Sequence, residues 1–451
     1  MTDNISSELL SYMQNHKIIN THSHHREDHR FETVTLDNLL SDSYVNWSGV
    51  PLPSIHAERT AYLKKVQCRS YFVWLQKALQ DLYGFTELIS AGNWDSISRL
   101  IEASHKDSRY HMDVLQKKCG YRKVILDAYW QPGSDNGHAG LFAPALRVNS
   151  FFFGYSSDSR DHNGNNCRSL YGITARNMDD YVDAMKAVIL QKKAQGCIAL
   201  KCALAYDRDL HFHSADKEQA NHALTCSDAE RTPEDIRVFQ DYLFQQICEI
   251  SAEAGLPLQC HTGLGLLQGS QAIHLAQAIA RNPDTKFVLL HCGFPWTDDV
   301  SGLLHNYTNV YPDLSWLPIL SPAAAKQMIH QLIELGNSDK VCWGCDTWTS
   351  EESYGALLAF RQVLTAVLSE KIQDGYFLLM MPKRSSIVIS MIMRSVYINF
   401  DILLSPRVDI YFIPRQVPRE GLDDPVTVQI GNANIWAPTQ DDIFTVSDFD
   451  S

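Results

Sequence analysis

Eight short apolar segments recur along the chain, and most of them are followed by a longer segment with helical periodicity. Within each segment the apolar residues are nearly continuous rather than alternating, which is typical of parallel strands buried on both faces. The pattern predicts strands at residues 17–23, 123–130, 146–154, 197–206, 256–263, 286–293, 309–316 and 341–348.

Amphipathic segments lie between these strands, with apolar residues spaced as on one face of a helix. One of them opens with Thr232-Pro233-Glu234-Asp235, a typical helix start. Strands that alternate with helices in this way predict an α/β fold, a (β/α)8 TIM barrel. An open doubly wound sheet is disfavoured by the strand number and by the absence of a glycine-rich first turn. The helices expected after the third to eighth strands are residues 178–193, 233–254, 271–281, 298–305, 322–335 and 351–368.

The connection after the first strand, residues 26–118, is far too long for a single helix. It contains helical patterns at 71–82 and over most of 93–119, together with a proline-rich turn at 51–53. We interpret it as a helical insertion that forms a lid over one end of a barrel spanning residues 1–377.

The last segment, residues 378–451, has a different character. Helical periodicity is lost after residues 374–377, residues 387–404 are apolar and β-branched, and residues 426–436 have a strand-like pattern. A barrel ordinarily ends with a sealing helix, and this segment contains no convincing one. We therefore treat 378–451 as an atypical C-terminal segment and hypothesise that it derives from a shifted reading frame.

The charge balance limits the classes of molecule that we expect the protein to bind. Lysine and arginine number 39 against 52 aspartate and glutamate, a net charge of −13 without a long basic run. This argues against nucleic-acid and membrane partners. The N-terminus lacks a secretory signal pattern, and the odd number of cysteines, 11, gives no sign of a disulfide framework. We expect a cytoplasmic protein with a small-molecule substrate, and homo-oligomer formation stays open.

Side chains that bind metals follow four of the predicted strands. The first strand ends in His22 and His24, which the period of two places on the same side. The fifth ends in His261, the sixth in His291 and the eighth in Asp346. In a barrel the carboxyl ends of the strands converge at one mouth, where active sites of this fold lie. Imidazoles with a carboxylate suit zinc or another first-row divalent metal that keeps an open position for water.

Two further features belong to the fourth strand. Lys201 lies in an otherwise apolar run, and burying a lone ammonium is costly, so this lysine needs a partner or a function. It could be a carbamylated metal ligand, a cation for a substrate carboxylate, or a structural partner of Asp127 or another carboxylate. The pair His211 and His213 after this strand is interpreted as part of a solvated loop.

Together these motifs resemble the amidohydrolase superfamily over residues 17–377. The shared features are the two histidines after the first strand, a lysine on the fourth, single histidines after the fifth and sixth, and an aspartate after the eighth. Residues 69–85, 344–348 and 353–356 look like the amidohydrolase-2 branch that is related to uronate isomerases. The first strand departs from the pattern, because Asn20-Thr21 stands where members often carry an aspartate.

The resemblance implies a role for each of these residues. His22, His24, His261 and Asp346 would bind the metal, expected to be zinc, with Mn, Fe or Ni as alternatives. His291 would be a catalytic histidine in a mononuclear site or a ligand in a binuclear one. Lys201 occupies the position where binuclear members carry a bridging carbamylated lysine.

The leading reaction is hydrolysis of a small carboxylated amide, ester or lactone by metal-activated water. Asp346 would accept the proton of the water, and His291 would polarise the substrate carbonyl. The alternatives are sugar-acid isomerisation as in uronate isomerases, non-oxidative decarboxylation, and a non-catalytic barrel that only binds a ligand. Thr347-Trp348 after Asp346 weakens the isomerase alternative, since uronate isomerases look more like Asp-Ser-Arg there. The candidate substrate-binding residues are Lys201, Arg69, Arg147, Tyr129, Trp130, Arg208, Trp316 and Trp348.

Overall fold

The computed structural model describes residues 2–335, 340–376, 426–430 and 433–437. It divides into two units, residues 1–403 and 404–451. In the second unit, β8 (Val426–Ile430) and β9 (Ala433–Ala437) pair antiparallel, which agrees with the strand-like pattern at 426–436. The apolar segment 387–404 lies outside the described residues, so the hypothesis about the tail stays a prediction. No helix in the described part of the chain is long and apolar enough to cross a membrane.

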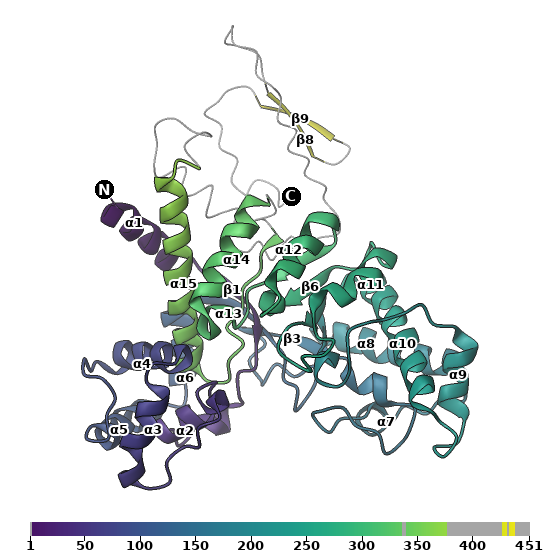
Figure 1. Ribbon diagram of the computed structural model, residues 1–451, viewed down its shortest axis with the longest axis horizontal. Helices are drawn as coiled ribbons and strands as arrows, with labels where there is room; N and C mark the ends of the chain where they lie inside the picture. The colour runs from purple at the N-terminus through teal and green to yellow at the C-terminus, as the bar shows by residue number, and fades with distance from the viewer. Residues whose placement is uncertain (1, 336–339, 377–425, 431–432, 438–451) are drawn as a thin grey trace. The chain divides into compact units, whose positions relative to one another are not determined.

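The first unit is built on seven parallel strands whose order in the sheet follows their order in the chain. The sheet curls, and helices pack around it (Figure 1). The predicted α/β barrel architecture is confirmed. The strands are β1 (Ile18–Ser23), β2 (Tyr121–Leu126), β3 (Phe142–Arg147), β4 (Ala199–Cys202), β5 (Leu258–His261), β6 (Phe287–Leu290) and β7 (Val310–Asp313).

The predicted eighth strand is an irregular segment, residues 341–348, that lies between β7 and β1. On the β7 side its only bridge is Asp313 with Cys342. On the β1 side the amides of Thr21 and His24 donate to the carbonyls of Trp343 and Thr347, each over 3.0 Å. Gly344 makes this approach possible, because a Cβ there would lie 2.4 Å from the backbone nitrogen of His22. The segment therefore closes the sheet without forming a regular strand.

The third strand lies earlier in the chain than predicted. β3 ends at Arg147, and Asn149–Phe153 form a 3-10 helix. Phe151 and Phe152 are fully buried, with Phe151 stacked on Tyr171 and Phe152 close to Phe244. The apolar run therefore reflects burial against helices rather than strand pairing. The loop between β2 and β3 holds no helix.

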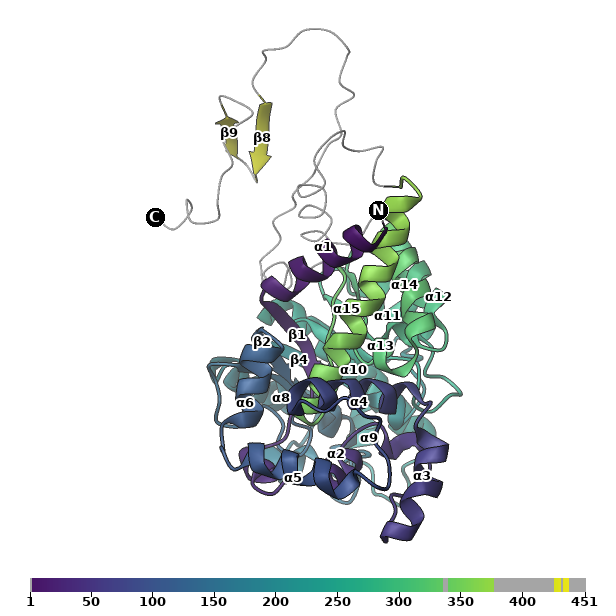
Figure 2. The ribbon, with the colours of Figure 1, turned by 90° about the vertical axis from the view of Figure 1, so that its left-hand side faces the viewer.

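The predicted helices are confirmed with small shifts at their ends. α10 begins with the capping box of Thr232 and Asp235 that its sequence indicates. An unpredicted N-terminal helix, α1, packs beside α15 (Figure 2). Outside the lid the helices are α1 (Thr2–Asn15), α7 (Cys167–Tyr171), α8 (Met178–Ala194), α9 (Lys217–Thr225), α10 (Pro233–Ala254), α11 (Ala276–Arg281), α12 (Thr297–Asn306), α13 (Leu317–Leu320), α14 (Pro322–Glu334) and α15 (Ser350–Gln373).

The insertion 26–118 is helical, as predicted, and has its own hydrophobic core around Trp94 and Phe72. Its helix α4 packs along α15 of the barrel. Buried polar contacts add to this junction, because the Tyr83 hydroxyl and the His105 ring both contact the Glu351 carboxylate, at 2.6 and 2.7 Å. Its helices are α2 (Leu36–Ser41), α3 (Arg59–Val66), α4 (Ser70–Tyr83), α5 (Trp94–His105) and α6 (Tyr110–Asp113).

Glu351 and its neighbour Glu352 should affect stability in opposite pH ranges. Burial disfavours the Glu351 carboxylate, but the contacts with His105 and Tyr83 outweigh it and hold its pKa at about 2. Its stabilising effect is therefore present above the unfolded pKa of about 4.3 and is lost as the pH falls towards 2. Burial raises the pKa of Glu352 to about 8. The protonated form of Glu352 therefore stabilises the folded state fully below about pH 4.3, and this contribution is lost as the pH rises from about 4.3 to 8.

We expect Glu351→Gln to lower the free energy of unfolding by about 1–3 kcal/mol at pH 7, with a smaller deficit below pH 4. The matched variant Glu352→Gln should be at least as stable as the unmodified chain at pH 8. Denaturant unfolding at pH 4, 7 and 8 measures both differences. Equal destabilisation by both variants at every pH would contradict the opposite pKa shifts of Glu351 and Glu352.

Candidate active site

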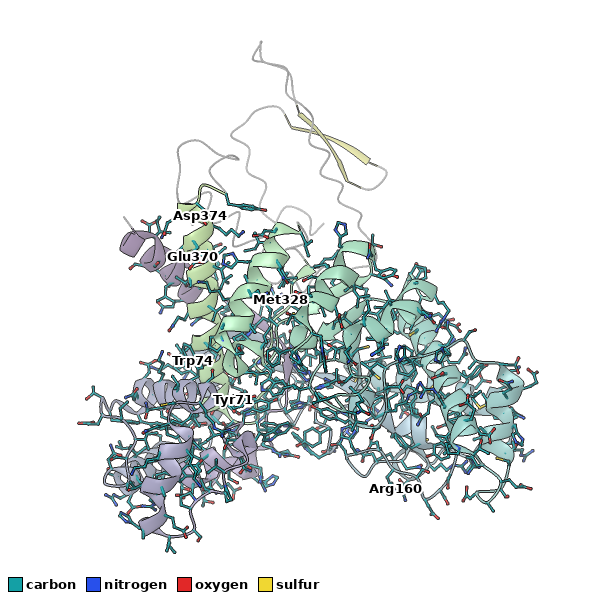
Figure 3. All side chains as sticks on the ribbon, in the orientation of Figure 1. Tyr71, Trp74, Arg160, Met328, Glu370 and Asp374 are labelled. Carbon is teal, nitrogen blue, oxygen red and sulfur yellow. The ribbon has the colours of Figure 1, made fainter. Side chains whose placement is uncertain are left out.

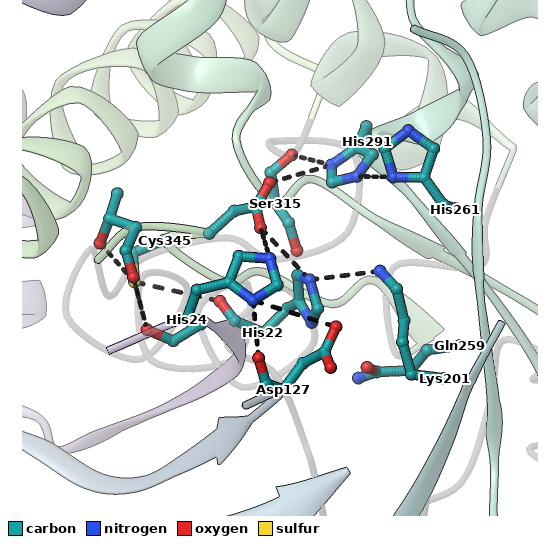
Figure 4. Close-up of polar contacts among 12 residues, drawn as sticks. His22, His24, Asp127, Lys201, Gln259, His261, His291, Ser315 and Cys345 are labelled. Carbon is teal, nitrogen blue, oxygen red and sulfur yellow. Dashed lines mark hydrogen bonds and ion pairs between the residues drawn. The ribbon is translucent and has the colours of Figure 1, made fainter. Parts of the chain in front are cut away.

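His22, His24 and Asp346 form a compact group at the carboxyl end of the barrel. Their ligand atoms all lie within 4.8 Å of one another, and all three residues are buried. β1 carries both histidines, and the closing segment carries the aspartate. The Nε2 atoms of His22 and His24 lie 3.2 and 3.1 Å from Asp346 Oδ1. Figure 4 shows the His22 and His24 side chains next to each other, with Lys201 in contact with His22.

The hydrogen bonds around this group leave no proton between His24 Nε2 and the carboxylate of Asp346. His24 Nδ1 lies 2.8 Å from the backbone carbonyl of Asp127, to which only an N–H can donate. In a neutral ring its Nε2 is then a lone pair that faces a carboxylate oxygen, and Asp346 Oδ1 has no hydrogen-bond donor among the described residues. A cation between these atoms removes the repulsion, and such a fixed tautomer is typical of a metal-binding histidine.

The protonation states also suit a metal. Burial and the neighbouring Lys201 lower the pKa of His22 to about 3, so its ring is neutral. Burial opposes ionisation of Asp346, but the contact with His22 outweighs it and holds its pKa well below the usual range. Two neutral imidazoles and one carboxylate are a donor set that fits a divalent metal with open coordination positions.

Lys201 faces this group from β4. Its Nζ lies 3.3 Å from His22 Nε2, and the side chain is buried. Burial lowers its pKa to about 8, an effect that the charge of Asp127 partly offsets. Asp127 itself is held by Arg147 through hydrogen bonds of 2.6–3.2 Å. The structural pairing with Asp127 considered for Lys201 is therefore taken by Arg147.

His261 and His291 form a pair next to the group, with His261 Nδ1 3.0 Å from His291 Nε2. The other nitrogens face the carbonyls of Leu264 at 2.7 Å and Ser315 at 3.1 Å. Three hydrogen bonds need three protons, and two neutral rings supply two. His261 thus lies outside the three-residue group, and its role as a metal ligand stays a prediction.

The second carboxylate oxygen of Asp346 contacts two other side chains. The Tyr44 hydroxyl donates to Oδ2 over 2.8 Å, and His291 Nδ1 lies 3.7 Å from the same oxygen. Burial and the charge of Asp346 raise the pKa of Tyr44, so the phenol keeps its proton. Sequence reasoning missed Tyr44, because no spacing relates a lid residue to an aspartate some 300 positions later.

Aromatic side chains from the lid and the barrel form a roof over the group. Trp348 stacks on His24 with ring centroids 5.7 Å apart, and Trp316 packs edge-on to His291 at 5.4 Å. Tyr44 lies between these two tryptophans, and the 57% exposed Trp47 closes the outer side. Tyr71 of α4 joins the roof where the lid meets the barrel (Figure 3). The roof over the site is therefore largely aromatic.

The predicted substrate-binding residues are only partly brought together. Trp316 and Trp348 belong to the roof, Lys201 contacts His22, and Tyr129 packs against His24 at 5.3 Å with Trp130 beside it. The three arginines are already engaged. Arg147 binds Asp127, Arg208 binds Asp241, and the exposed Arg69 donates to the carbonyl of Ser48. His211 contacts His274 at the surface, in agreement with a loop position.

The backbone at the mouth adopts unusual conformations. His291, Trp316 and Asp346 have φ angles of 63°, 65° and 58°, in the left-handed region that side chains rarely occupy. Such conformations cost energy and persist where the surroundings hold them, most often at functional sites. All three residues contribute to the group or its roof.

We expect Tyr44→Phe to retain the metal and to reduce turnover by about 10- to 100-fold. The change removes one hydrogen bond to a charged oxygen of Asp346, a contact of about 1.5–3 kcal/mol. Elemental analysis and steady-state kinetics measure the two effects. The matched variant Tyr62→Phe, in the lid core, should leave both unchanged; an equal rate loss there would point to general lid damage.

Comparisons with known proteins bear on the family and on the fold. Residues 227–378 match the model of the amidohydrolase family. Protein fluG of Emericella nidulans is 36% identical over 126 residues, which are 26% of this chain and 14% of that protein. The chain therefore spans well under two thirds of this relative's length.

Solved structures share the fold. Glucuronate isomerase from Caulobacter crescentus superposes with a TM-score of 0.69 at 16% identity, covering 90% of this chain and 95% of that one. Uronate isomerase from Thermotoga maritima gives 0.68 at 16% identity, over 89% and 97%. A protein of Lactobacillus casei assigned as a metal-dependent hydrolase gives 0.63 at 16% identity, over 88% and 96%. Residues 227–378 therefore resemble the amidohydrolase family, and the chain shares its fold with uronate isomerases and with a metal-dependent hydrolase.

Proposed function

We propose that this chain is a metal-dependent hydrolase of a small amide, ester or lactone that carries a carboxylate. The observation that carries the proposal is the buried group of His22, His24 and Asp346, in which the unprotonated Nε2 of His24 faces a carboxylate oxygen. Zinc is the metal that we propose for it, because two imidazoles and one carboxylate leave a tetrahedral ion an open position. A divalent metal bound there would polarise a carbonyl and lower the pKa of a bound water from about 15.7 towards ~7.

Three residues of the chain have roles in the proposed reaction beside the metal. Asp346 is ionised and accepts the proton of the attacking water on Oδ2, the oxygen that faces Tyr44 and His291. Tyr44 orients this carboxylate through its hydrogen bond. His291 Nδ1 carries a proton and lies 3.7 Å from the same oxygen, where its N–H can donate to the developing oxyanion.

The roof favours hydrolysis over sugar-acid isomerisation. Tyr44, Trp47, Trp316 and Trp348 offer flat apolar surfaces and few hydrogen-bonding groups, whereas a polyhydroxylated substrate requires many polar partners. Isomerisation is the alternative that the experiment must separate, since fold alone does not decide the reaction.

The test uses zinc-loaded protein with three sets of compounds: aryl esters and amides that carry a carboxylate, lactones, and uronic acids. Chromatography identifies the products. We expect hydrolysis of at least one carboxylated ester, amide or lactone and no turnover of uronic acids. Ketose formation from a uronic acid without any hydrolysis would overturn the proposal. Protein loaded with Mn, Fe or Ni provides the comparison for the metal.

A further inference from the structure

Arg26 lies close to the metal-binding group and has no acidic partner. It follows the ligand His24 by two residues, and its backbone amide donates to the carbonyl of Trp348 over 3.0 Å. Its guanidinium stacks on Trp130, with Cζ 4.6 Å from the ring centroid, and touches the Tyr129 hydroxyl at 3.4 Å. No carboxylate lies within ion-pair distance of Arg26 in the described part of the chain.

The burial of Arg26 makes this lack of a partner costly. The side chain is only partly exposed, and its Nε is buried without a hydrogen-bond partner among the described residues. Asp28, two residues further on, contacts His111 and His138 instead. Stacking on Trp130 and one hydrogen bond to Tyr129 replace only part of the hydration that the guanidinium loses, and a bound anion would supply the rest.

The position of Arg26 relative to the metal-binding group limits the size of a molecule whose anionic group could bind there. The Arg26 guanidinium and the His24 imidazole both lie next to the Tyr129 ring, with Cζ 5.8 Å and the imidazole centroid 5.3 Å from the Tyr129 centroid. The two groups therefore lie no more than about 11 Å apart, so a small molecule can reach both. The aromatic side chains on either side favour a flat body between its two ends.

We infer that Arg26 binds the carboxylate of the substrate and positions its reacting group at the metal. This inference rests on the proposed function and names the substrate class, a short and flat carboxylate such as an aryl carboxylic acid derivative. Arg26 takes the role that sequence reasoning assigned to Arg69, Arg147 and Arg208. The planar guanidinium can form two parallel hydrogen bonds with a carboxylate, which lysine cannot do.

The test measures binding of benzoate and of its neutral counterpart benzamide to the zinc-loaded protein. Tryptophan fluorescence follows the titration, because Trp130 and Trp348 lie beside the site, and calorimetry provides a second readout. We expect Arg26→Gln to weaken benzoate binding by about 10- to 100-fold and to leave benzamide binding unchanged. Arg26→Lys keeps the charge and should retain part of the affinity.

The matched control is Arg30→Gln, which removes the same charge from an arginine that is half exposed and paired with Asp42. It should bind benzoate as the unmodified chain does. Unchanged benzoate binding in Arg26→Gln, or no preference for benzoate over benzamide in the unmodified chain, would overturn the inference.

The same preparations separate this inference from the proposed function. Arg26-dependent benzoate binding without hydrolysis of any compound would refute the hydrolase and retain the anion site. Hydrolysis of carboxylated and neutral esters at rates that Arg26→Gln leaves unchanged would retain the hydrolase and refute the role of Arg26.

Discussion

Replacing Asp346 with Asn is expected to lower turnover by at least about 10²–10⁴-fold while part of the metal is retained. The amide oxygen can still lie between the two imidazoles, but the amide cannot accept a proton from water at neutral pH. It also loses the charge that Tyr44 and His291 face. Rates on the best compound of the panel and metal-to-protein ratios measure the two effects separately.

The control for this variant is Asp298→Asn, which changes an exposed carboxylate on α12. It should keep both rate and metal. Full activity in Asp346→Asn would refute the assignment of the base, and with it the proposed reaction.

Replacing His24 with Ala is expected to lower metal affinity by more than about 100-fold. The change removes one of three clustered ligands, and the carbonyl of Asp127 loses the ring that it orients. A ligand that binds only the folded state raises the unfolding temperature, so added zinc should stabilise the unmodified chain and have little effect on His24→Ala.

Elemental analysis and thermal unfolding with and without zinc give independent readouts of this loss. His305→Ala, at an exposed position on α12, should behave as the unmodified chain in both. Unchanged metal content in His24→Ala would remove the basis of the site.

Sequence reasoning succeeded where a periodic pattern reports directly on burial. Continuous apolar runs located six strands of the sheet closely, and α10 begins and ends at the predicted residues. The third strand was placed too late because Phe151 and Phe152 are buried by a 3-10 helix, and burial alone does not distinguish the two conformations. The helix α1 was missed because its residues were considered only for a signal pattern.

Some residues of the site could likewise be predicted from the sequence, and others could not. His22, His24 and Asp346 could be brought together in advance because the ends of neighbouring strands in a barrel must converge. Which arginine faces the substrate could not be predicted, since it depends on pairs such as Arg147 with Asp127 that form only in the folded chain. His261 differs because its ring turns to His291 rather than to Asp346.

The few residues of the lid around Tyr44 and Trp47 have a consequence for how this scaffold can diverge. Tyr44 orients the carboxylate of Asp346, and Trp47, three residues later, borders the opening of the roof. A change in this segment that admits a new substrate therefore also disturbs the group that moves the proton. Exchanging the lid between relatives should therefore change the rate and the substrate range together.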